Sequence, residues 1–81
     1  MAEVEVRYFA AVADVTGRAK ETIALPANAT IGDLKAELRQ RYPGIDPVLR
    51  VSAYLVAGEL TRDAAAALAP RVDVLPPFAG G

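Results

Sequence analysis

The two glycines that end the sequence, Gly80 and Gly81, are the residues whose type and position most directly suggest chemistry. We expect Gly81 to present a free carboxylate at the end of a thin backbone. Glycine has no Cβ, so such a segment can enter a slot that side chains would block and can adopt backbone angles that other residues avoid. Two terminal glycines alone could also be a frayed end without a role, since most chain ends are poorly ordered. The rest of the chain favours the first interpretation.

The side chains offer little catalytic chemistry of their own. The sequence has no Cys and no His, which removes thiolate nucleophiles, zinc ribbons and the commonest general base. The carboxylates show no metal-ligand or acid/base spacing, and Glu3 and Glu5 share one face of an expected strand as solvated surface. Lys20 and Lys35 stand in polar contexts. We therefore expect no metal site, no bound cofactor and no enzyme activity of the chain on its own, so the chemistry lies at its terminal carboxylate or with a partner.

Composition limits the class of protein further. A single domain is expected for 81 residues, of which 53% are hydrophobic. Nine Lys and Arg residues against ten Asp and Glu residues give a net charge of −1, which favours neither nucleic acid nor a membrane as a partner. The longest apolar run, residues 64–70, is too short to span a bilayer. The acidic, alternating start is unlike a signal peptide, so we expect a cytoplasmic protein.

Strands with two-residue alternation must position the tail. The pattern predicts strands over residues 3–10, 20–25, 52–56, 59–61 and 71–75, with a tight turn at Ala57-Gly58. In the first strand, Val4, Val6 and Tyr8 share one face, and Phe9 lies on the other with the polar residues.

One main helix is expected after Thr30. The segment Thr30-Ile31-Gly32-Asp33 is typical of a capping box, and Pro43-Gly44 ends the helix. Shorter helical turns are expected over residues 11–15 and 46–50, and Asp63 can cap the alanine run 64–69. The order ββαβββ, or ββαββ if the short strand does not pair, predicts an α+β fold: a mixed four- to five-stranded sheet with one main helix packed on one face. With the first and last strands adjacent and parallel, this is the β-grasp (ubiquitin-like) topology, with a domain over 1–76 and a flexible tail over 77–81.

Strand parity places apolar residues on the face away from the helix. In the last strand Val72 and Val74 share one face, so Leu75 lies on the other, where Phe9 and Leu60 can join it. Either loops cover these residues, or they form a protein-docking patch beside the root of the tail.

Four segments carry a resemblance to a known family: Arg7-Tyr8-Phe9-Ala10-Ala11, Thr30-Ile31-Gly32-Asp33-Leu34, Val56-Ala57-Gly58-Glu59 and Val74-Leu75-Pro76-Pro77-Phe78-Ala79-Gly80-Gly81. They resemble the small subunits of molybdopterin synthase, the MoaD-like sulfur carriers of the MoaD/ThiS superfamily. The Leu-Pro-Pro-x-x-Gly-Gly end is the most specific. Ala57-Gly58 stands where the family usually has Asn-Gly, and Ala69-Pro70-Arg71 shortens a turn that usually contains Asp and Gly, which leaves the conformation of that turn open.

The resemblance implies a reaction at Gly81. A carboxylate with a pKa of roughly 3.3–3.7 is ionised and unreactive at neutral pH. In the family, an ATP-dependent (E1-like) enzyme adenylates it, and a sulfur donor protein converts it to a thiocarboxylate. The large subunit of a heterotetrameric synthase then takes up the tail, and sulfur passes to a cyclic pyranopterin monophosphate in molybdenum cofactor biosynthesis.

The resemblance also implies which residues bind partners, with Gly80 beside the reactive Gly81. The partner-binding positions are Phe9, Leu60, Leu75, Pro76, Pro77 and Phe78. The two prolines stiffen the start of the tail. Phe78 either anchors the tail in an apolar pocket of the partner or folds back on its own sheet.

Other functions fit the same fold. Carriers for thiamine or cysteine biosynthesis also end in Gly-Gly, although their tails usually lack Pro-Pro. A ubiquitin-like modifier and a plain interaction module are further alternatives.

Overall fold

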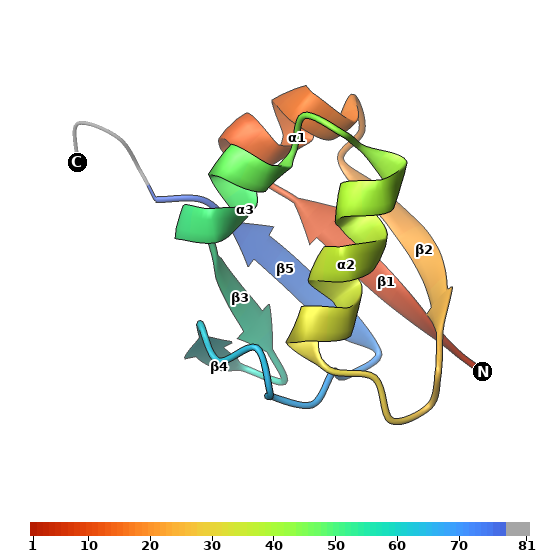
Figure 1. Cartoon of the computed structure of the whole chain (residues 1–81). Coiled ribbons are helices and arrows are strands. Elements are labelled where there is room, and N and C mark those ends of the chain that lie inside the picture. The colour runs from red at the N-terminus through yellow and green to blue at the C-terminus, as the bar shows by residue number, and fades with distance from the viewer. Residues whose placement is uncertain (78–81) are drawn as a thin grey trace.

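The chain forms a mixed sheet with helices packed on one face (Figure 1). A computed structural model describes residues 1–77. The elements in this range are β1 (Ala2–Tyr8), α1 (Ala10–Thr16), β2 (Lys20–Leu25), α2 (Ile31–Arg41), α3 (Asp46–Val51), β3 (Ala53–Val56), β4 (Glu59–Thr61) and β5 (Arg71–Leu75). Helix α2 lies across the sheet, whereas α1 and α3 lie together at one end of it (Figure 1). These elements confirm the predicted α+β class and a five-stranded sheet.

The strand order is β2-β1-β5-β3-β4. Strands β1 and β5 pair in parallel, with Glu5 beside Arg71 and Tyr8 beside Val74. Every other neighbouring pair in this sheet is antiparallel. The predicted β-grasp topology is therefore confirmed, and β5 lies in the middle of the sheet, between the first strand and the β3–β4 hairpin.

Helix α2 begins where the capping box predicts. The Asp33 backbone N–H donates to Thr30 Oγ1 at 3.3 Å, and the Thr30 backbone N–H donates to Asp33 Oδ2 at 2.9 Å. The reciprocal pair satisfies N–H groups that the first turn of a helix leaves free. The apolar residues Ile31, Leu34 and Leu38 are fully buried against the sheet.

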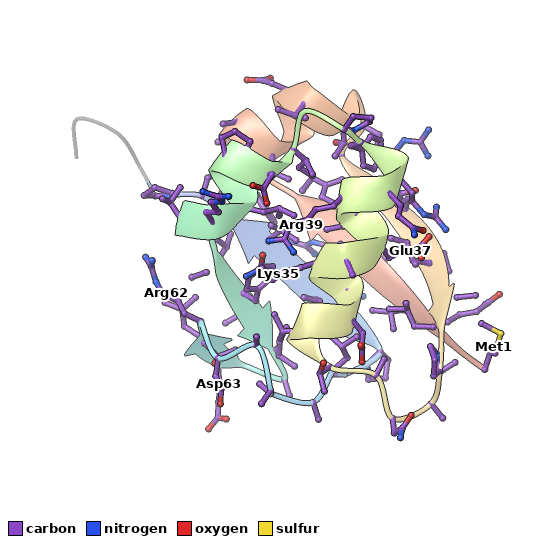
Figure 2. The ribbon with its side chains drawn as sticks, in the orientation of Figure 1. Met1, Lys35, Glu37, Arg39, Arg62 and Asp63 are labelled. Carbon is purple, nitrogen blue, oxygen red and sulfur yellow. The ribbon has the colours of Figure 1, made fainter. Side chains whose placement is uncertain are left out.

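Figure 2 shows charged side chains on the outer side of α2, with Glu37 on the side nearer β2 and Arg39 on the side nearer β3. Arg39 Nε lies 2.6 Å from Asp46 Oδ1, which links α2 to α3. Glu37 pairs with Arg41 one turn later on the same helix. These exposed pairs contribute modestly to stability, because solvent screens them.

The first strand is shorter than the alternation predicts. It ends at Tyr8, and Phe9 is the N-cap residue of α1, with extended angles of φ −126° and ψ 147°. Ala10 then takes a positive φ of 49°, which ends the strand. Phe9 still continues the extended backbone, so its side chain keeps the parity that the sequence assigned to it.

The alanine run 64–69 forms no helix. Asp63 Oδ1 does accept the backbone N–H of Ala65, but this contact closes only a turn. The run instead serves α2: the carbonyls of Ala66 and Ala64 accept the N–H groups of Ile31 and Gly32 at 2.9 and 2.8 Å. Hydrogen bonds to the free N–H groups of the first turn of α2 therefore outweigh the helix propensity of the alanine run.

The core lies between α2 and the inner face of the sheet. Its members are the buried apolar side chains of the strands and helices, namely Val4, Val6, Tyr8, Val12, Ile23, Leu25, Ala29, Ile31, Leu34, Leu38, Ile45, Leu49, Tyr54, Val56, Val72 and Val74. The inner-face residues of β1 and β5 are the ones that the alternation predicts. Burial of these side chains is the main force that stabilises the fold.

A polar cluster joins β1, β2 and the end of α2. The carboxylate of Glu21 on β2 accepts hydrogen bonds from the hydroxyls of Tyr8 and Tyr42. Arg18 Nη1 and Arg41 Nη1 lie 3.5 and 3.3 Å from Glu21 Oε1, and the Glu21 side chain is only 8% exposed. A buried charge of this kind is tolerated because it is both paired and hydrogen-bonded.

Burial opposes the ionisation of Glu21, but the hydrogen bonds from Tyr42 and Tyr8 and the charges of Arg18 and Arg41 outweigh it. The pKa of Glu21 therefore lies below its ordinary value. Burial and the hydrogen bond to Glu21 raise the pKa of both Tyr8 and Tyr42. A carboxylate with a lower pKa in the folded state stabilises the fold above the pKa of the unfolded chain and loses that contribution as pH falls.

We predict that Glu21→Gln lowers the free energy of unfolding at neutral pH by about 1–3 kcal/mol, because the hydroxyls of buried Tyr8 and half-buried Tyr42 lose a charged acceptor. Wild-type stability should fall as pH drops below 4.5, the ordinary pKa of this carboxyl, and the variant should show a flatter decline. Urea unfolding at a series of pH values measures both effects. Glu3→Gln, at an exposed carboxylate on β1, is the matched control, and an equal loss in both variants would contradict the prediction.

Candidate functional site

The outer face of the sheet, away from the helices, carries an apolar band. We define the band as Phe9, Leu55, Leu60 and Leu75. Strand register brings its members together. Leu60 on β4 pairs with Leu55 on β3, and Leu75 on β5 pairs with Ala53, which lies two residues before Leu55 on the same face of β3. Leu60 is 65% exposed, and the other three side chains are half-buried. A partly exposed apolar set on neighbouring strands, contiguous on one face, is typical of a protein-binding surface.

Phe9 lies at the β1 end of this band. Tyr8 pairs with Val74, so the next position on each extended segment brings Phe9 alongside Leu75. The guanidinium carbon of Arg7 lies 5.4 Å from the centroid of the Phe9 ring, which stabilises the ring on the outer face. The structure thus brings together the three apolar positions that strand parity selected.

Sequence reasoning missed Leu55. Tyr54 and Val56 are buried on the inner face, so their neighbour Leu55 must point outward. The same alternation was visible in the sequence, but an all-apolar strand of four residues does not reveal which parity faces the core. Leu55 contributes the link between Leu60 and the middle of the sheet.

The root of the tail follows directly from β5. The strand ends at Leu75, Pro76 is buried in the fold, and Pro77 is exposed. Pro76 therefore belongs to the packed part of the free chain, and only Pro77 of the two prolines offers its ring to a partner. Phe78, Gly80 and Gly81, which the sequence selected as site residues, lie outside the described residues.

Two segments that differ from the family pattern have defined geometry. Ala57 and Gly58 both have positive φ, 52° and 83°, as a two-residue hairpin turn requires. At the short turn 69–71, the Pro70 carbonyl accepts the Glu5 N–H at 2.8 Å, which fixes the start of β5 against β1. The shortened turn therefore leaves the central pairing intact.

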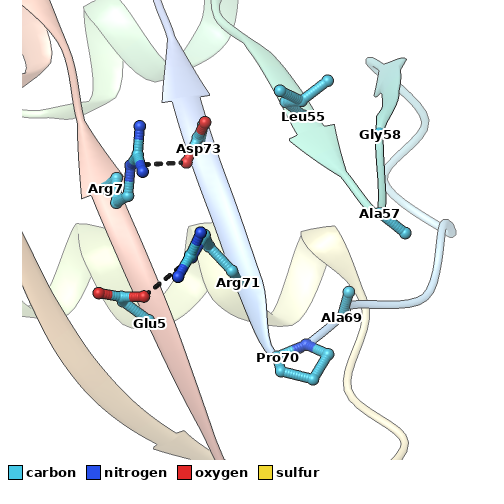
Figure 3. A pocket seen from close by; sticks show the side chains of 9 residues that line it. All are labelled: Glu5, Arg7, Leu55, Ala57, Gly58, Ala69, Pro70, Arg71 and Asp73. Carbon is cyan, nitrogen blue, oxygen red and sulfur yellow. Dashed lines mark hydrogen bonds and ion pairs between the residues drawn. The ribbon is translucent and has the colours of Figure 1, made fainter.

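Next to the band, the outer face becomes charged between β1 and β5. Arg7 Nε lies 3.2 Å from Asp73 Oδ1, and Arg71 Nε lies 3.0 Å from Glu5 Oε1 (Figure 3). The four residues form one side of an open hollow of about 600 Å³, and its other side is formed by Leu55, Ala57, Gly58, Ala69 and Pro70. We call it the charged hollow.

Tyr54 and Asp46, which have shifted pKa values, lie outside the charged hollow. Burial raises the pKa of Tyr54 to about 12, and a hydrogen bond from Arg39 lowers the pKa of Asp46. Neither of them lines the charged hollow, and neither does the Glu21 cluster. Within residues 1–77, no acidic side chains gather in a group that could bind a metal ion.

Among the helices of residues 1–77, none is both long enough and apolar enough for a membrane span.

Known proteins resemble the chain over nearly its whole length. A model of the ThiS family matches residues 6–81. The human molybdopterin synthase sulfur carrier subunit is 34% identical, and the match covers 100% of this chain and 97% of that protein. The resemblance inferred from the sequence motifs is thereby confirmed.

Solved structures agree with the fold. A chain in the complex of subunits 1 and 2 of the molybdopterin-converting factor from Helicobacter pylori matches with a TM-score of 0.68 and 26% identity, covering 98% of this chain and 99% of that one. Small archaeal modifier protein 1 from Haloferax volcanii matches with a TM-score of 0.81 and 24% identity, covering 96% of this chain and 100% of that one. The second likeness shows the fold alone. On the family match and the full-length human relative together, this chain belongs to the ThiS family of β-grasp proteins.

Proposed function

We propose that the chain is the sulfur-carrier small subunit of a molybdopterin synthase. The observation that carries this proposal is the 34% identity to the human molybdopterin synthase sulfur carrier subunit over the full length of the chain. The Leu-Pro-Pro-x-x-Gly-Gly ending supports it, because a carrier needs a narrow terminal segment that enters the active site of another protein. The cytoplasmic location expected from composition is part of this proposal.

The proposed chemistry takes place at the Gly81 carboxylate. An adenylating partner transfers AMP from ATP to a carboxylate oxygen and releases pyrophosphate. Hydrosulfide supplied by a donor protein then attacks the acyl carbon and displaces AMP, which leaves a thiocarboxylate. The carrier finally gives this sulfur to a cyclic pyranopterin monophosphate in the active site of the large subunit. ATP is thus used by the partner, and the carrier itself needs no cofactor.

The apolar band is the proposed docking surface for the large subunit. It lies on the open face of the sheet, and Leu75 is both a member of the band and the last residue of β5 before the tail. Docking at the band therefore fixes the starting point of the tail relative to the partner. The related Helicobacter pylori structure is a complex of subunits 1 and 2, which supports a large-subunit partner here.

We predict that the protein isolated from its native cells contains a fraction whose C-terminal Gly81 is heavier by the difference between one sulfur and one oxygen atom. Intact-mass and C-terminal peptide mass spectrometry measure this change. Removal of Gly81 should abolish both the mass shift and sulfur transfer in a reconstituted synthase, while the circular dichroism spectrum stays unchanged, because residues 1–77 form the packed fold.

Three outcomes would contradict this function. Sulfur transfer by the chain without Gly81 would exclude the terminal carboxylate as carrier. Covalent conjugates of higher mass on target lysines would instead identify a modifier. Thiamine auxotrophy with intact molybdoenzyme activity, after deletion of the gene, would identify a different sulfur pathway.

The band gives a second prediction. Phe9→Asp and Leu75→Asp should raise the dissociation constant for the large subunit by roughly tenfold to a hundredfold, as expected for apolar anchor residues. Leu60→Asp should weaken binding with little effect on stability, since Leu60 is 65% exposed. Isothermal titration calorimetry measures the affinity, and thermal unfolding measures stability.

Val15→Asp is the matched control, because Val15 is an apolar residue on α1 that is 41% exposed and lies outside the band. Equal weakening by Val15→Asp would mean that the band is not the contact surface. Unfolding of the Phe9 or Leu75 variants would mean that these side chains act in the fold instead.

A further inference from the structure

The charged hollow contains two arginines whose outer nitrogens are unused. Arg7 faces Asp73, and Arg71 faces Glu5, through Nε in each case. Within residues 1–77, neither arginine donates a hydrogen bond from its Nη atoms. An arginine can bind a carboxylate through two parallel N–H groups, and neither pair here uses that arrangement. The side chains of Arg71 and Arg7 are 64% and 40% exposed, so their Nη groups remain available to a partner.

The acidic groups of the hollow are less available. Glu5 is shared, because Lys20 Nζ lies 3.8 Å from its second carboxylate oxygen. Asp73 Oδ1 is buried, and among residues 1–77 no donor reaches it with hydrogen-bond geometry, so a partner cannot reach this oxygen either. The lining of the hollow thus holds two guanidinium groups and two carboxylates, whereas Lys20 and Glu3 line separate hollows. The charges of these four residues balance, and the groups left free are the outer N–H donors of the two arginines.

The shape of the hollow narrows the choice of occupant. Opposite the arginines, its wall is made of small apolar side chains, with Ala57 from the β3–β4 turn and Ala69 and Pro70 from the segment before β5 (Figure 3). An acidic side chain fits both walls, because its methylene stem can contact the apolar wall while its carboxylate meets the guanidinium groups. Leu55 lines the hollow and also belongs to the apolar band, so the two surfaces are continuous.

We propose that the charged hollow receives an Asp or Glu side chain of the large subunit when that subunit docks on the apolar band, with Arg71 and Arg7 as its ligands. This inference rests on the proposed function, because it assumes the same partner. The hollow adds specificity to a band that is otherwise only apolar. A partner with a basic or neutral residue at this position leaves the outer Nη groups of the two arginines without a protein acceptor.

The test is a binding titration of the full chain with the large subunit at low and high salt. Arg71→Glu should raise the dissociation constant at low salt by about tenfold or more, since it places a carboxylate directly against the acidic side chain of the large subunit. Arg71→Ala should raise it less and should weaken its dependence on salt. Lys35→Glu on α2 makes the same change of charge on the helix side of the sheet and should leave affinity within about twofold. Circular dichroism verifies that each variant is folded.

A chemical readout identifies the occupant. In the double variant Glu5→Gln, Arg71→Lys, carbodiimide treatment of the complex should couple the new amine to an acidic residue of the large subunit, which peptide mass spectrometry locates. The inference is overturned, while the proposed function stands, if the wild type binds the large subunit and Arg71→Glu binds it with the same affinity. It is also overturned if the new amine couples to no acidic residue of the large subunit. A wild-type chain that neither binds the large subunit nor acquires sulfur overturns the proposed function itself.

Discussion

Parallel pairing of β1 with β5 is the interaction on which the site depends. It joins residues about as far apart in sequence as this chain allows, since Glu5 lies beside Arg71 and Tyr8 beside Val74. Two parallel strands need a crossover connection, and here all the elements from α1 to β4 form that connection between β1 and β5. The cost of closing so long a loop is met by burial, because Val6, Val72 and Val74 are fully buried beneath the helices. One register therefore determines both the core and the relation of Phe9 to Leu75.

The sheet then separates two tasks by its two faces. The inner face, covered by α2, contains the large apolar side chains and excludes water. The outer face carries the apolar band and the charged hollow, whose side chains are half-buried or exposed. Because successive residues of a strand point to opposite faces, the binding surface can change without disturbing the core. This division suits the proposed carrier, because a docking surface on one face leaves the core on the other face undisturbed.

Much of this arrangement could be read from the sequence because its signals are local. The Thr30–Asp33 capping box, the turn at Ala57-Gly58 and the alternation of Arg71 to Leu75 each determine their own geometry. Features that depend on distant partners are not visible in the sequence pattern. The alanine run forms no helix, because its carbonyls accept the N–H groups of Ile31 and Gly32. Leu55 was overlooked, because the parity of an entirely apolar strand is decided only by the sheet it joins. The charged hollow needs the β1–β5 register, which no single segment contains. The assignments at Gly80 and Gly81 remain predictions, since they rest on chemistry and family resemblance.

The central position of β5 has a mechanical consequence. A force on Pro77 that acts along the axis of β5 is resisted by the ladder to β1 on one side and the ladder to β3 on the other. Against β1, which is parallel and pairs over the same length, the force acts as shear, so the hydrogen bonds share the load instead of opening one after another. An edge strand would be peeled away bond by bond under the same force. The domain can therefore be drawn against a binding partner by its end without losing its shape.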